Sequence, residues 1–120
     1  MEKILVMTDA SRTSAGNVDD LSSEVPRLVR EWKEALKNCA DERRETWEIL
    51  SMNISKVNSK NFQVLGMLYN VIRDFQRDNE YPRRVRIVCG SDETARMYRA
   101  VYNFYVPRTK DERMRDNSWD

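Results

Sequence analysis

The chain has 120 residues, of which 40% are apolar and 34% are charged. Its 21 basic and 20 acidic side chains leave a formal net charge of +1, which argues against nucleic-acid binding, because nucleic-acid-binding proteins gather excess positive charge on one surface. The absence of histidine removes the commonest general base, the usual serine and cysteine triads and most zinc sites.

Membrane and export signals do not stand out in the sequence. No stretch reaches the roughly 18 consecutive apolar residues of a membrane span. The apolar run at residues 4–7 is too short for a signal peptide, and Asp9 follows it closely. Cys39 and Cys89 lie outside any metal or redox motif, which favours two reduced, buried thiols. We therefore expect a cytoplasmic protein that does not bind a membrane.

The first half of the chain predicts a strand and a helix. Residues 1–8 form a short apolar strand, and residues 9–17 form a polar loop rich in turn formers. Ser23 is the expected cap of the helix, with Pro26 tolerated in its first turn. The helix frays through residues 41–44. Its apolar side chains recur at helical spacing: Val25, Leu28, Val29, Trp32, Leu36 and Cys39.

The second half predicts two further strand–helix pairs. Residues 47–54 have apolar side chains on both faces, typical of an inner strand covered by helices on each side. A polar loop at 55–61 leads into a helix from about Phe62 to Arg77. The apolar run at 85–89 is the third strand, and the last helix continues to Val106, with Ser91 as its cap.

The order β-α-β-α-β-α predicts an α/β fold in three layers, with a small parallel sheet between helices. We expect one domain over residues 1–106. Residues 107–120 are charged and lack periodicity, which predicts a flexible C-terminal tail.

Ligands of parallel α/β sheets bind where strands end and helices begin. Three loops are expected to converge there, at residues 9–17, 55–61 and 90–92. Free N–H groups at helix N-termini hold anions, so the expected pocket suits a phosphate-bearing small molecule. The candidate ligand-binding residues are Asp9, Ser11, Ser55, Asn58, Ser59, Ser91 and Asp92.

The simpler interpretation is that these are ordinary capping and turn residues. The loops contain only Gly16 and Gly90, and phosphate-binding loops generally need more glycine for close backbone approach. Asp9 and Asp92 both follow strands and suit a metal ion or an acid–base pair, although loop and cap roles are commoner. We therefore predict no catalytic residue, no metal and no cofactor.

Residues 71–102 resemble the last helix, strand and helix of the macro domain, the ADP-ribose-binding module. Residues 3–8, 28–40 and 49–55 are similar to the preceding strand, long helix and strand of that family, so the resemblance covers residues 1–106. It implies the fold of a truncated macro domain. The matching residues are Val71-Ile-Arg-Asp-Phe75, Pro82, Val85-Arg-Ile-Val-Cys89, Asp92-Glu93, Ala95 and Met97-Tyr98.

The chain departs from the macro family at its binding residues. The N-terminal half of the family, with its adenine-binding aspartate, has no counterpart, and the loop at 55–61 lacks the glycines of the diphosphate loop. The resemblance therefore implies a non-catalytic module that acts through protein contacts or weakly binds a nucleotide or ADP-ribose-type ligand. The alternative is an enzyme that acts on a nucleotide or ADP-ribose adduct through Asp9 or Asp92.

In the macro sheet, a strand from the missing half separates the first two strands kept here. This chain must then pair those strands directly or accept a strand from another molecule. An open three-stranded sheet also exposes edges that favour self-association. We therefore expect a homodimer.

Two other resemblances give alternatives. Ile4-Leu-Val-Met-Thr-Asp-Ala-Ser11 is similar to the opening of universal stress proteins, which bind ATP, but the glycine-rich phosphate segment of that family is missing. Thr8-Asp-Ala-Ser11 also resembles the first strand of ribonuclease H, whose aspartate binds magnesium. Gln63 stands where that resemblance requires a metal-binding glutamate.

Overall fold

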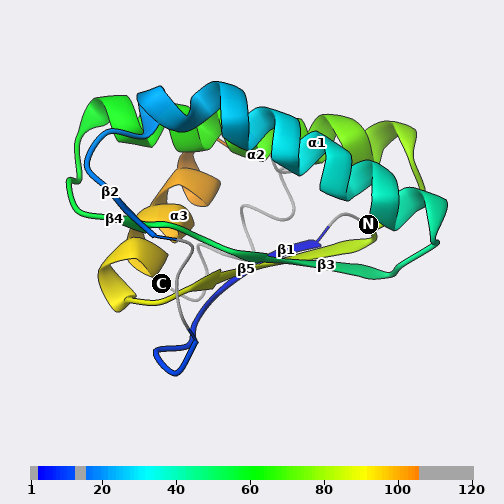
Figure 1. Ribbon diagram of the computed structural model, residues 1–120, viewed down its shortest axis with the longest axis horizontal. Helices are drawn as coiled ribbons and strands as arrows, with labels where there is room; N and C mark the ends of the chain where they lie inside the picture. The colour runs from blue at the N-terminus through cyan, green and yellow to red at the C-terminus, as the bar shows by residue number, and fades with distance from the viewer. Residues whose placement is uncertain (1–2, 13–15, 106–120) are drawn as a thin grey trace, which may run out of the picture.

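The computed structural model describes residues 3–12 and 16–105, so the expected tail at 107–120 lies outside the described residues. The three predicted strand–helix pairs are present in order (Figure 1). The strands are β1 (Lys3–Thr8), β2 (Asn17–Val18), β3 (Thr46–Leu50), β4 (Asn53–Ile54) and β5 (Arg84–Cys89). The helices are η1 (Leu21–Glu24), a short 3-10 helix, and α1 (Val25–Asp41), α2 (Ser59–Asp78) and α3 (Asp92–Tyr105).

Three strands form a parallel sheet in the order β1-β5-β3, which confirms the α/β class. We expected the strands at residues 1–8 and 47–54 to pair directly or to accept a strand from another molecule. This expectation is wrong, because β5 lies between β1 and β3. Ile87 pairs with Val6 on one side and Ile49 on the other. Val85, Ile87, Val88 and Cys89 of this central strand are fully buried, whereas Arg84 and Arg86 are exposed.

The strand predicted over residues 47–54 is broken at Ser51 and Met52, where it changes partner. Ser51 N donates to Val88 O of β5 at 2.9 Å, whereas Asn53 N donates to Gly16 O at 2.8 Å and Ser55 N to Val18 O at 3.0 Å. β3 therefore pairs with β5, and its continuation β4 pairs with β2 on the opposite side.

This change of partner explains the path of the crossovers. The chain leaves β1 at one edge of the sheet and re-enters at β2, beyond β3 and β4. The connections β2-α1-β3 and β3-α2-β5 then both step toward β1. Two crossovers that step in the same direction place their helices on the same face when they share one hand.

The helices gather on one face of the sheet, which differs from the expected arrangement with helices on both. α1 and α2 lie side by side above the strands (Figure 1). α3 joins the same core, where Tyr69 Oη of α2 donates to Tyr98 O at 2.8 Å. On the other face, Glu48, Arg84 and Arg86 are exposed, and they alternate along their strands with the buried side chains.

The cap expected at Ser23 is wrong, because Ser23 Oγ donates to Asp20 O at 3.0 Å instead of receiving a helix N–H. Asp20 caps the preceding η1 turn by accepting from Ser22 N.

The prediction of two free, buried cysteines is confirmed. Within residues 3–12 and 16–105, no helix is both long and apolar enough to cross a bilayer.

α2 and α3 approach each other closely at Gly66. A Cβ atom at this position would lie 2.8 Å from Cδ2 and 2.9 Å from Cγ of Tyr105. Real Cβ contacts are essentially never this short, so the Tyr105 ring can pack here only because Gly66 has no side chain.

Gly66→Ala tests this packing. In an ordinary helix interior, this substitution stabilises the fold by about 1 kcal/mol. Here we expect a loss of about 1–3 kcal/mol, because the added methyl group must displace the Tyr105 ring. Urea denaturation measures the difference in the free energy of unfolding.

The control is the same substitution in a Tyr105→Ala background. With the ring removed, alanine at this position should regain its ordinary stabilising effect. A gain in stability from Gly66→Ala alone would contradict the close approach of the two helices.

Candidate functional site

Two of the predicted site residues form a turn at the carboxyl end of β1. Asp9 N donates to Cys89 O at 2.9 Å, which places Asp9 beside the end of β5. Its carboxylate accepts hydrogen bonds from Ser11 Oγ at 2.6 Å and from Ser11 N at 3.1 Å. These two bonds hold the pKa of Asp9 below its ordinary value. The polar groups of Asp9 and Ser11 are therefore already hydrogen-bonded to each other.

Ser91 caps α3, as predicted. Its Oγ accepts from Thr94 N at 3.2 Å and donates to Thr94 Oγ1 at 3.0 Å. Thr94 Oγ1 in turn accepts from Ile54 N at 3.2 Å, which ties the start of α3 to β4. Asp92 lies exposed in the first turn of the helix, where a carboxylate is favoured by the helix dipole.

The remaining candidates lie around the start of α2. Ser55 Oγ donates to Val18 O at 3.2 Å and contacts the Asp19 carboxylate. Asn58 Oδ1 accepts from Asn61 N at 2.9 Å and so caps α2, and Ser59 is its exposed first residue. Local capping and turn bonds therefore occupy five of the seven candidates. Whether the set binds a ligand stays a prediction.

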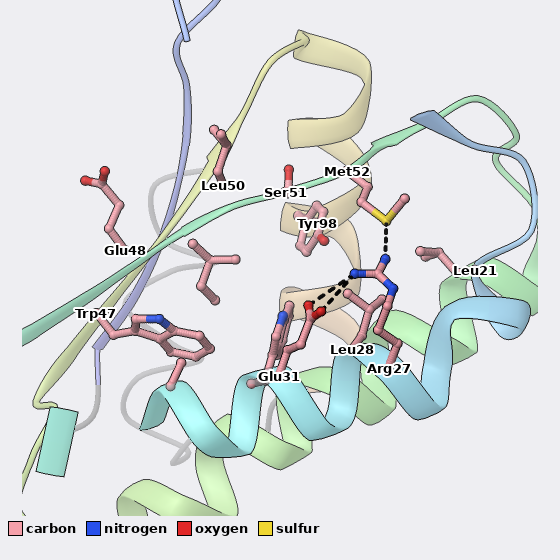
Figure 2. Close-up of a pocket in the computed structure, with 13 residues that line it drawn as sticks. Leu21, Arg27, Leu28, Glu31, Trp47, Glu48, Leu50, Ser51, Met52 and Tyr98 are labelled. Atoms are coloured by element: carbon pink, nitrogen blue, oxygen red, sulfur yellow. Dashed lines mark hydrogen bonds and ion pairs between the residues drawn. The ribbon is translucent and has the colours of Figure 1, made fainter. Parts of the chain in front are cut away.

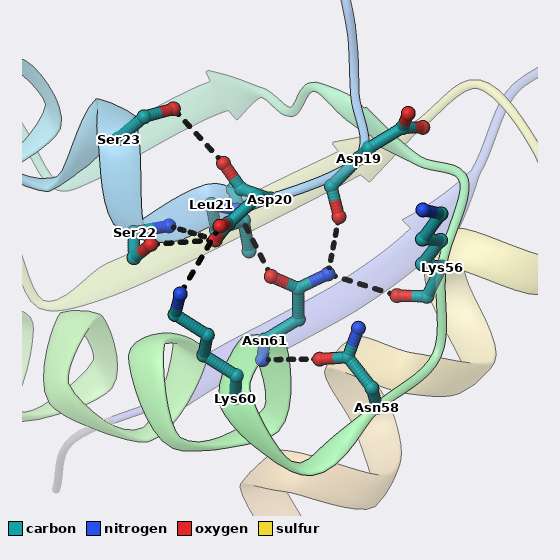
Figure 3. A network of polar contacts seen from close by, with 9 residues as sticks. All are labelled: Asp19, Asp20, Leu21, Ser22, Ser23, Lys56, Asn58, Lys60 and Asn61. Atoms are coloured by element: carbon teal, nitrogen blue, oxygen red, sulfur yellow. Dashed lines mark hydrogen bonds and ion pairs between the residues drawn. The ribbon is translucent and has the colours of Figure 1, made fainter.

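Sequence reasoning missed the role of Asn61, which is fully buried at the start of α2. Figure 3 shows its side chain between two chain segments. Asn61 Oδ1 accepts from Leu21 N at 2.9 Å, and Nδ2 donates to Asp19 O at 2.8 Å and Lys56 O at 2.9 Å. This amide joins the segment before α1 to the segment before α2. The spacing of Asn61 from Leu65, Leu68 and Ile72 would have placed it on the buried face.

The neighbouring Asp20 is exposed, and its carboxylate points toward Ser22 and Lys60 (Figure 3). It accepts from Ser22 Oγ at 2.6 Å, from Ser22 N at 3.0 Å and from Lys60 Nζ at 3.2 Å. The Ser22 bonds, with a smaller contribution from Lys60, lower the pKa of Asp20 to about 2.

A groove of about 250 Å³ runs between α1 and β3, and we call it the edge groove (Figure 2). None of the seven predicted residues lines it. Its walls come from two elements, with Leu21 and Tyr98 completing them. α1 contributes Arg27, Leu28, Glu31, Trp32 and Ala35, and the β3 side contributes residues 47–52.

Large aromatic side chains form the inner wall of the edge groove. The rings of Trp32 and Trp47 meet edge to face, with centroids 5.7 Å apart and planes at 86°. Tyr98 reaches the groove from α3 (Figure 2). Burial raises the pKa of Tyr98, so its hydroxyl is neutral. The groove therefore has aromatic walls, and Tyr98 and Ser51 are the hydroxyl-bearing residues of its lining.

Charged side chains line the rim of the edge groove. Arg27 is held between Glu24, at 2.8 Å, and Glu31, at 3.1 Å, and its Nη2 also lies 3.6 Å from Met52 Sδ. The hydrogen bonds that Arg27 donates to Glu24 and then to Glu31 raise the pKa of Arg27. Glu48 forms an ion pair with Arg12. The lining residues thus carry two carboxylates, Glu31 and Glu48, and one guanidinium that is already paired.

A second, shallow groove of about 390 Å³ lies where α2 begins and α3 ends. Val57 and Phe104 are each 74% exposed there, and Phe62 packs edge to face on Phe104 with ring centroids 5.6 Å apart.

In the described part of the chain, no three histidine, cysteine or carboxylate groups gather closely enough to hold a metal ion.

Comparison of the chain with protein-family models, with curated proteins and with solved structures finds no match. The functional interpretation therefore depends on the geometry of the molecule.

Asn61→Asp tests the buried amide. We expect a loss of stability of about 2–5 kcal/mol, because a buried carboxylate would face two carbonyl oxygens that now accept from Nδ2. Thermal and urea unfolding measure the change. Asn70→Asp, at an exposed position of the same helix, is the matched control and should change stability by about 0.5 kcal/mol or less. Equal losses in the two variants would contradict the assigned network.

Asp20→Asn tests the acid dependence of the cap. The pKa of Asp20 is lowered on folding, so its charge stabilises the fold above the unfolded pKa of about 3.9, and this contribution is lost as the pH falls toward 2. Asparagine keeps the cap acceptor and removes the charge. We expect the melting temperature of the variant to fall less between pH 5 and pH 2 than that of the wild type. Asp41→Asn is the control, and an unchanged acid dependence in Asp20→Asn would contradict the assignment.

Proposed function

We propose that this chain is a non-catalytic α/β binding module that works through contacts with another protein, and that the edge groove is its binding surface. The observation that carries the proposal is a hollow with aromatic walls along the outer side of β3. Concave sites with apolar and aromatic walls and a few polar groups are the usual binding sites of proteins. The resemblance to the macro domain stays a prediction.

The charges around the edge groove support a protein partner over a nucleotide. A phosphate-bearing ligand needs a cation or a set of free N–H groups. Arg27 is the cation in the lining, and Glu24 and Glu31 already hold it. Binding of a nucleotide or ADP-ribose-type ligand would therefore have to displace two ion pairs.

The predicted homodimer is kept as a separate proposal about the sheet edges. Arg99 of α3 donates to Val6 O at 3.3 Å and so occupies one acceptor on the outer side of β1. On β3, an antiparallel pair with a second copy centred on Glu48 would bring two carboxylates face to face, which is unfavourable. Light scattering after size exclusion measures the assembly state, and a monomer at high micromolar concentration would contradict the dimer.

A display selection tests the protein-contact function. Random seven-residue peptides are selected on the wild-type chain and then measured on Ala35→Trp, which fills the edge groove from α1. We expect the selected peptides to bind this variant roughly tenfold or more weakly, because the new indole occupies the space that a peptide side chain would enter. Ala100→Trp, at an exposed position of α3, is the matched control and should leave binding unchanged.

Binding of small molecules tests the alternative that this chain binds a nucleotide. A ligand at about 100 times its Kd stabilises a protein by roughly 2.7 kcal/mol, which a thermal shift detects. We expect no shift with ADP-ribose, ATP, AMP or Mg²⁺ at millimolar concentration. A shift that Asp9→Asn abolishes, together with no groove-dependent peptide, would overturn the proposal in favour of the nucleotide interpretation.

A further inference from the structure

We infer that the edge groove takes an extended peptide, which adds as a strand to the outer side of β3 and carries a basic side chain opposite Glu48. This inference rests on the proposed function and specifies the form and chemistry of the partner. Strand addition is a common mode of peptide recognition, in which main-chain hydrogen bonds give affinity and side-chain pockets give specificity.

Half of the backbone groups of β3 face away from β5, along the groove. Ser51 N donates to Val88 O, so the odd-numbered residues of β3 direct their backbone groups toward β5. Glu48 and Leu50 direct theirs to the opposite side, because backbone direction alternates along a strand. The order β1-β5-β3 places no strand there, and no hydrogen bond from residues 3–12 or 16–105 reaches these groups.

The shape of the edge groove fits a strand beside β3 better than a ligand over one face of the sheet. The groove touches every residue from 47 to 52. Side chains of successive strand residues point to opposite faces, so contact with all of them places the groove along the edge. α1 lies along the groove with Leu28 (Figure 2), and Trp32 and Ala35 of the same helix also line it.

The chain itself already places a strand on this side. β2 pairs in parallel with β4, and β4 continues the line of β3 after the change of partner at Ser51 and Met52. A peptide beside β3 would therefore continue the row that β2 begins. The fold thus already holds a strand, β2, beside the chain immediately after Ser51 and Met52.

The side chains of the edge groove select the chemistry of the peptide. Residues that point toward α1 would meet Leu28, Trp32 and Ala35, which favours apolar side chains. Residues that point to the other face would lie beside Glu48 and Leu50. Glu31 is a second carboxylate, on the α1 rim, and it is paired with Arg27. Glu48 is paired with Arg12 through two part-exposed side chains, and such surface pairs contribute little, so a basic side chain of the peptide would take the place of Arg12.

A pair of synthetic peptides tests the inference, one alternating valine with lysine and one alternating valine with glutamate. We expect the lysine peptide to bind roughly tenfold more tightly, because cross-strand pairs of opposite charge stabilise and like charges destabilise. Glu48→Lys should reverse the preference. Glu34→Lys, on the exposed side of α1, is the control and should leave the preference unchanged.

Amide hydrogen exchange supplies the signature of strand addition. On binding, the amides of Glu48 and Leu50 should gain protection, whereas those of Trp47 and Ile49, which already face β5, should change little. Binding without this alternation, or a preference for the glutamate peptide, would overturn the inference.

The two proposals fail in different ways. Selected peptides that need an open groove, yet protect no alternating amides, would overturn strand addition and leave the protein-contact function standing. If neither designed nor selected peptides distinguish the wild type from Ala35→Trp at millimolar concentration, both proposals are overturned.

Discussion

The burial of β5 is the constraint on which the rest of this fold depends. Its residues Val85, Ile87, Val88 and Cys89 have no exposed surface, so the strand must have a neighbour on each side. β1 and β3 are those neighbours, and each keeps one side that faces away from the sheet. The outer position of β3 at one edge of this sheet follows from this order.

The change of partner after β3 connects the fold to the edge groove. Because β4 pairs with β2 instead of β5, α1 begins beyond the edge of the sheet and runs back over it. The same helix that covers the core with Leu28 and Trp32 therefore also overhangs the outer side of β3.

The sequence predicted those features that depend on neighbouring residues. The strand at 85–89, the Ser91 cap and the positions of the three long helices were confirmed, because local apolar spacing and capping chemistry determine them. The position of β5 between β1 and β3, the β2–β4 pair and the Asn61 network join segments far apart in the chain. Local patterns do not contain that information. The edge groove was missed for the same reason, since its walls come from α1, β3 and α3.

The order of the strands also has a consequence for how the chain reaches its native state. Thr46 and Lys3 both align with Arg84, so neither outer strand has a partner in the three-stranded sheet until β5 has been synthesised. Every pairing in this sheet is therefore distant in sequence or waits for the last strand, and such topologies fold slowly. During synthesis on the ribosome, β1 and β3 remain with open edges until β5 emerges, which exposes them to wrong pairing in the interval.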